Sequence, residues 1–231
     1  MEQRNALQAQ AFSLYAVVVG LAIREGLVRV IPRLTLSSDV PPLPPLPSWQ
    51  QLLYTFRLIV FLTVAIRFFL GAVHYFNSVH FDAQANERYK HKSFGLDFLI
   101  GLVHFLFFFA WATTITDPER AHAAGGSHFV GLCVVILLYD LVWLLVCWRY
   151  DSAAEIKLWC AINLGTCVLV AVAFFGLHEI FAADAVLREQ LSMAIVLLVS
   201  LIDIAEIVNG RSYIANGLSF LLSKRSLPQS G

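Results

Sequence analysis

The feature that most constrains this chain is a series of apolar runs of about 20 residues. At a rise of 1.5 Å per residue, an α-helix of about 20 residues crosses a hydrocarbon layer of about 30 Å. Backbone polar groups inside lipid must be satisfied within their own segment, which favours helices, and the sequence lacks the ten-residue alternating segments of membrane β-barrels. The runs cover residues 11–31, 53–76, 95–115, 128–148, 157–177 and 190–209.

The composition agrees with this class, because 58% of the residues are hydrophobic and 14% are charged, against about 25% charged in soluble domains. We therefore predict an all-α fold, a polytopic integral membrane helix bundle in which residues 1–231 form a single transmembrane domain with six transmembrane helices. The run at 11–31 is interrupted by Arg24, Glu25 and Arg29. If this run lies in the membrane interface instead, five spans remain.

The loop charges predict the direction of insertion, because short cytoplasmic loops carry an excess of Lys and Arg. With six spans, one side holds nine basic residues and the other three, or four if Arg29 lies outside the first span. Both termini are then cytoplasmic, and the expected location is a plasma (inner) membrane. The nine residues are Arg4, Arg88, Lys90, Lys92, Arg149, Lys157, Arg211, Lys224 and Arg225, and the opposite three are Arg33, Arg120 and Arg188.

Three polar segments connect or follow the runs. Residues 33–50 are proline-rich and are predicted to form an extended extracytoplasmic linker. Residues 79–93 form the main cytoplasmic loop, which is too short to be a domain. Residues 214–231 form a cytoplasmic tail with an in-plane amphipathic helix whose Lys224 and Arg225 would meet anionic lipid headgroups.

Charged residues inside the apolar runs are the candidates for function, because each costs about 2.5–3.5 kcal/mol at the centre of an isolated span. Depth along the runs places Arg67, His104 and Asp140 near the bilayer midplane, Asp203 slightly further in, and Asp97 near the inner end of its run. We predict that these five residues form one polar track, with Arg67 as the counter-ion of Asp140 or Asp203. The alternative is that they only fix helix register and packing.

Other polar residues in the runs have secondary roles. His74 lies seven residues after Arg67 and is expected on the same helix face, and Asn163 and Glu206 are further members of the polar set. Arg57, near an outer membrane surface, is expected to extend its charge into the interface. Glu25 and Arg29 are expected to pair as i,i+4 neighbours.

The motifs for other chemistry are missing from the sequence. There is no GxSxG, HExxH or P-loop pattern, so no catalytic residue is assigned. His74, His104, Asp97 and Asp203 are not spaced as metal or haem ligands, so no metal or cofactor is expected. The four cysteines are interpreted as packing residues, and the net charge of zero excludes a nucleic-acid partner.

The sequence favours a small channel or transporter for an ion or small solute. Because a 26 kDa protomer can hardly enclose a wide pore alone, a channel would be a homo-oligomer. The second hypothesis is a membrane anchor or effector subunit that acts through a cytoplasmic protein partner at the 79–93 loop and the basic tail. An intramembrane enzyme is the third and weakest hypothesis.

Overall fold

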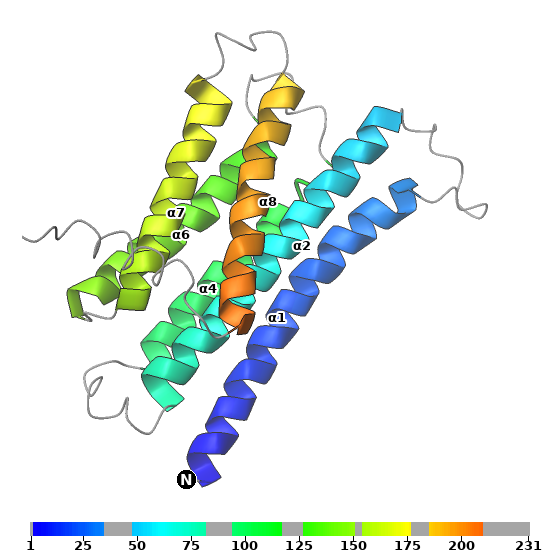
Figure 1. The fold of residues 1–231 in the computed structure, drawn as a ribbon. Coiled ribbons are helices and arrows are strands. Elements are labelled where there is room, and N and C mark those ends of the chain that lie inside the picture. The colour runs from blue at the N-terminus through cyan, green and yellow to red at the C-terminus, as the bar shows by residue number, and fades with distance from the viewer. Residues whose placement is uncertain are drawn as a thin grey trace, which may run out of the picture.

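The computed structural model describes residues 2–34, 48–81, 94–116, 127–150, 154–176 and 185–209, and all regular elements among these residues are helical (Figure 1). Two α-helices, α2 and α7, continue into π-helical segments, η1 and η2. Each predicted apolar run coincides with one α-helix apart from its ends. The elements are α1 (Glu2–Leu34), α2 (Ser48–Phe76), η1 (Asn77–Phe81), α4 (Phe94–Ala112), α6 (His128–Tyr150), α7 (Ala154–Ala171), η2 (Val172–Gly176) and α8 (Ala185–Asn209).

Among the described residues, four helical segments are long and apolar enough to cross a membrane, which indicates a membrane protein. A fifth apolar segment within α6, His128–Trp143, is shorter. Helix α1 is not among the four and carries Arg24, Glu25 and Arg29. The four segments are Trp49–Phe81, Phe94–Ala112, Trp159–Gly176 and Ala185–Val208.

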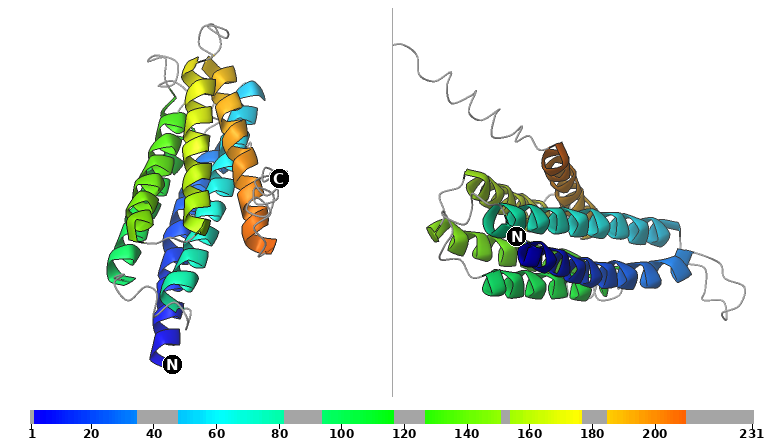
Figure 2. Two further views of the ribbon diagram at one scale, coloured as in Figure 1. Left: turned by 60° about the vertical axis from the view of Figure 1, so that its left-hand side comes forward. Right: turned by 90° about the horizontal axis from the view of Figure 1, so that it is seen from below.

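The α-helices run alternately up and down, so that the start of α1 and the end of α8 lie at the same end of the bundle (Figure 1). In lateral order the helices contact one another as α1, α4, α6, α7, α8, α2 and back to α1. The end-on view in Figure 2 shows α1 and α2 side by side. Helix α2 also contacts α4 across this ring. The ring therefore has two halves, α1, α2, α4 and α6 on one side and α2, α6, α7 and α8 on the other.

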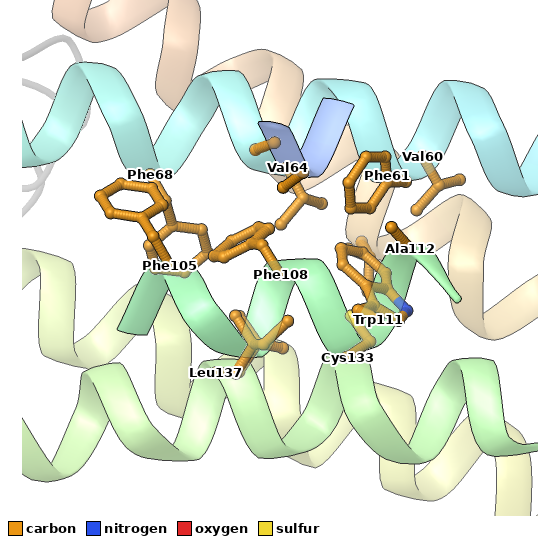
Figure 3. Close-up of a cluster of buried hydrophobic side chains, with 14 of the residues drawn as sticks. Val60, Phe61, Val64, Phe68, Phe105, Phe108, Trp111, Ala112, Cys133 and Leu137 are labelled. Carbon is orange, nitrogen blue, oxygen red and sulfur yellow. The ribbon is translucent and has the colours of Figure 1, made fainter. Parts of the chain in front are cut away.

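The half of the ring made by α1, α2, α4 and α6 is filled with aromatic side chains. Phe61 and Phe68 of α2 pack edge-on against Trp111 and Phe108 of α4, with ring centroids 5.4 and 5.6 Å apart. Figure 3 shows these rings between α2 and α4, above Cys133 and Leu137 of α6. Such offset pairs add to the stabilisation given by apolar burial.

Local hydrogen bonds explain where α6 begins and where α4 ends. Ser127 caps α6, because its side-chain oxygen accepts from the Val130 N–H at 3.2 Å. After Ala112 the chain of α4 tightens into turns in which Thr114 N–H donates to Trp111 O at 3.0 Å. These turns place Ile115 beside α2, where its carbonyl accepts a hydrogen bond from Arg57.

The structure changes several predicted boundaries. The proline-rich linker is shorter than the predicted 33–50, because α1 continues to Leu34 and α2 begins at Ser48. The predicted 79–93 loop begins as the end of η1. The sixth run begins at Ala185 rather than 190, so Arg188 belongs to α8 and not to a loop. Residues 35–47, 82–93 and the 214–231 tail lie outside the described residues.

Candidate functional site

The four helices α2, α6, α7 and α8 bring a group of polar side chains together in the bundle interior, which we call the central cluster. Arg67 of α2 donates from Nε to Asp203 Oδ2 of α8 at 2.5 Å and from Nη2 to Asn163 Oδ1 of α7 at 2.7 Å. Asn163 Nδ2 in turn donates to Asp140 Oδ2 of α6. Trp159 Nε1 of α7 donates to the same Asp140 oxygen at 3.0 Å. The sequence therefore paired Arg67 with Asp203 correctly, whereas Asp140 is reached only through Asn163.

The central cluster is removed from solvent. Arg67 and Asn163 have 0% of their surface exposed, Asp140 has 3% and Asp203 has 4%. The Arg67 guanidinium also lies 5.1 and 5.6 Å from the ring centres of Phe68 and Trp159, a geometry that stabilises a cation. The polar groups thus meet in direct contacts inside a closely packed interior.

Close packing of a glycine fixes the position of Trp159. A Cβ atom added to Gly71 of α2 would lie 1.9 Å from the Trp159 ring, so the indole rests directly on the α2 backbone. This contact holds the ring beside Arg67 and its N–H against Asp140.

The charges of the central cluster do not balance when both carboxylates are ionised. Asp140 and Asp203 share one cation, Arg67, and Trp159 and Asn163 are neutral donors. One proton on a carboxylate makes the cluster neutral, which matters because an uncompensated charge in a protein interior costs several kcal/mol.

Hydrogen-bond chemistry identifies the oxygen that such a proton would occupy. Arg67 can only donate, so the Asn163 oxygen must face Arg67 and the Asn163 amide must face Asp140 Oδ2. Asp140 Oδ2 therefore accepts from two donors, while no described residue donates to Oδ1. No described residue is shown donating to Asp203 Oδ1 either, but Asp203 is ion-paired directly with the Arg67 guanidinium. A proton on Asp140 Oδ1 leaves that ion pair intact, so Asp140 is the better candidate to hold it.

Asp97 and His104 do not join this cluster, so the single track predicted from depth is wrong. Asp97 Oδ2 of α4 accepts from Tyr75 Oη at 2.9 Å and lies 2.9 Å from His80 Nε2. His104 Nε2 lies 3.2 Å from the carbonyl of Ile136. The reason is lateral placement, because α4 packs mainly against α1, α6 and α2, whereas Asn163 and Asp203 lie on α7 and α8.

Of the three secondary candidates, one belongs to the central cluster and two do not. Asn163 is an essential link of the central cluster. His74 is exposed instead of sharing the buried face of Arg67, and Glu206 is half-buried on α8 outside the cluster. The predicted pair of Glu25 with Arg29 is present, with Arg29 Nε 2.6 Å from Glu25 Oε1.

A second buried ion pair was missed by the sequence reasoning. Arg57 does not extend into the interface but has 1% of its surface exposed, and its guanidinium donates to both oxygens of Glu189, at 2.5 and 2.8 Å. It also donates from Nη1 to Ile115 O at 3.1 Å and lies 5.4 Å from the Phe129 ring centre. The available signal was the helical spacing of Glu189 and Asp203 on one face of α8.

From the sequence, the cysteines are interpreted as packing residues and no metal site is expected. Cys133, Cys160 and Cys167 are buried and unbridged, and the side chain of Cys147 lies outside the described residues. In the part of the chain that the structure describes, no three His, Cys, Asp or Glu side chains gather as metal ligands would.

We compared the chain with known protein families, curated proteins and solved structures. No protein-family model, curated protein or solved structure matches the chain.

Proposed function

We propose that this protein is a membrane transport protein that binds and releases a proton at the central cluster, with Asp140 as the proton acceptor. The observation that carries the proposal is that the Arg67 guanidinium binds Asp203 directly and is joined to Asp140 through Asn163, so that two carboxylates from different helices have one cation between them in the cluster. Protonation at Asp140 Oδ1 neutralises the cluster and leaves the Arg67–Asp203 pair intact. Arg67 and Asp203 position and balance the site, and Asn163 couples the two carboxylates.

The proposal includes a membrane topology with six spans and cytoplasmic termini in a plasma (inner) membrane. It is supported by the alternating helix directions, which put the start of α1 and the end of α8 at the same end of the bundle. The nine basic residues that the sequence assigns to the side of the termini support it as well. Cysteine-accessibility labelling from each side of sealed vesicles, after replacement of the native cysteines, tests this topology. A homo-oligomer is proposed for a channel version, and light scattering of the purified protein in detergent tests it.

Proton flux into liposomes tests the function. The purified chain is reconstituted with a pH-sensitive dye inside, and flux is driven by a potassium diffusion potential. We expect wild-type protein to carry protons and Asp140→Asn to lose this flux, because an amide cannot accept the proton. Asp140→Asn also keeps the cluster neutral, so the variant should fold.

The matched control is Asp97→Asn, which removes a buried carboxylate outside the central cluster. It should retain most of the flux. If wild-type protein carries no protons under either polarity, or if Asp140→Asn equals wild type, proton transport through this cluster is excluded.

A membrane anchor or effector subunit is the second candidate, because the buried guanidinium–carboxylate pairs can serve helix packing alone. In that case a stoichiometric soluble protein should co-purify with the chain under gentle extraction. Deletion of residues 218–231 should release it, while flux is absent from wild type.

A further inference from the structure

The first turn of α8 buries an arginine that belongs to neither ion pair. Arg188 has 4% of its surface exposed and packs against η2. Its Nη1 donates to Phe174 O at 3.3 Å, and its guanidinium carbon lies 5.6 Å from the Phe174 ring centre. The neighbouring residue Glu189 points to α2, where Arg57 occupies both of its carboxylate oxygens.

Arg188 therefore has no counter-ion within the described residues. The carbonyl and the ring of Phe174 stabilise the guanidinium but carry no full negative charge. Its Nε is buried and has no hydrogen-bond partner. Such a donor carries its full desolvation cost until an acceptor arrives, and a buried cation needs an anion.

The surroundings of Arg188 add positive potential. The first turn of α8 contains no acidic residue, and the N-terminus of a helix carries a partial positive charge. The adjacent η2 is a π-helical segment, a distortion that is frequent at functional sites. A guanidinium at a helix N-terminus is a strong arrangement for binding an oxyanion.

We propose that Arg188 binds a phosphate-type oxyanion at this end of the bundle. Arg188 lies three residues after the start of the candidate span Ala185–Val208, about 4.5 Å along the helix. The span has 24 residues, about 36 Å, so its first turn lies near the edge of a hydrocarbon layer of about 30 Å. Lipid phosphates lie just beyond that edge, so the oxyanion is either a lipid headgroup or a small soluble phosphate. The inference does not depend on proton transport by the central cluster.

Thermal unfolding of the full chain in an uncharged detergent tests the site. Inorganic phosphate is titrated against chloride at equal ionic strength, and phosphatidylglycerol is titrated against phosphatidylcholine. We expect either phosphate or phosphatidylglycerol to raise the Tm of wild type, and Arg188→Gln to weaken the apparent affinity about tenfold or more, the loss of a charge-assisted contact. Arg24→Gln, at an exposed arginine of α1, should retain the response.

The two arms separate the sources: a response to phosphate identifies a soluble anion, and a response only to phosphatidylglycerol identifies a headgroup. Native mass spectrometry of wild type should show the same ligand retained, a reading that does not need a folded variant. The proposal is overturned if neither ligand acts, or if Arg188→Gln responds like wild type. It is also overturned if the Tm of wild type does not respond to either ligand while the Tm of Asp184→Asn does. Asp184, which precedes α8 in the sequence, would then be the counter-ion of Arg188.

Discussion

Breaking the Arg57–Glu189 pair should be one of the most damaging single changes in this bundle. Glu189→Gln is nearly isosteric, but it replaces two charge-assisted acceptors by one neutral acceptor and one donor that faces Arg57. Among the described residues, Arg57, with 1% of its surface exposed, then retains one neutral amide acceptor, the Ile115 carbonyl and the Phe129 ring, and it has no counter-ion. We expect a loss of about 3–5 kcal/mol in the free energy of unfolding, the usual cost of removing one partner of a buried pair.

The double variant Arg57→Met with Glu189→Leu separates the value of the pair from the cost of an orphaned charge. It removes both charges and leaves the Ile115 carbonyl without its side-chain donor, a cost of about 1 kcal/mol. Replacing a buried pair with apolar groups is often neutral or stabilising, so the double variant should be more stable than Glu189→Gln.

Unfolding in mixed micelles by increasing sodium dodecyl sulfate, followed by tryptophan fluorescence, measures these free energies. The reasoning is refuted if Glu189→Gln costs less than about 1 kcal/mol, the value of a solvent-exposed pair. It is equally refuted if the double variant loses as much free energy of unfolding as the single variants Arg57→Met and Glu189→Leu lose together. The two side chains would then not be coupled.

Two smaller predictions test how the helices pack. Gly71→Ala should cost about 1–3 kcal/mol, because the new Cβ would lie 1.9 Å from the Trp159 ring, and it should shift the tryptophan emission; Gly95→Ala, with no atom within 4 Å, should leave thermal unfolding and emission unchanged. Tyr15→Phe should cost about 0.5–1.5 kcal/mol, because it removes the 2.9 Å hydrogen bond from Tyr15 Oη to Phe98 O; an unchanged unfolding curve would contradict that contact.

The sequence predicted the helices well because their signal is local. A run of about 20 apolar residues marks a helix wherever it occurs, and the structure has an α-helix at each run. The boundary error at α8 has a physical cause. Arg188 and Glu189 were assigned to a loop because charges usually mark the end of a span, but here both side chains are buried within the bundle.

The candidate site was predicted only in part, because depth along a helix does not say which helices are neighbours. Arg67 and Asp203 share a depth and belong to α2 and α8, which pack together, so their pair was found. His104 is also placed near the midplane, but it lies on α4, which packs mainly against α1, α6 and α2. Its imidazole meets the Ile136 carbonyl instead.

His74 is exposed, although helical spacing puts it on nearly the same face of α2 as Arg67. Arg57 pairs with Glu189 and Arg67 with Asp203, so α2 and α8 ascend in residue number together and are parallel. Asn209, the last described residue of α8, lies six residues beyond Asp203, about 9 Å, whereas His74 lies seven residues beyond Arg67, about 10.5 Å. The described part of α8 therefore does not extend past the level of His74, which spacing along α2 alone could not show.

The polar and aromatic residues divide the bundle into two halves with different physical roles. The aromatic half, α1, α2, α4 and α6, contains the packed rings of Phe61, Phe68 and Trp111. The half made by α2, α6, α7 and α8 holds the central cluster, whose net charge changes with one proton. A proton therefore alters the forces between α6 and α8 without changing those between α1 and α4. For this reason any conformational response should be sought as a movement of α6, α7 and α8 relative to α1, α2 and α4.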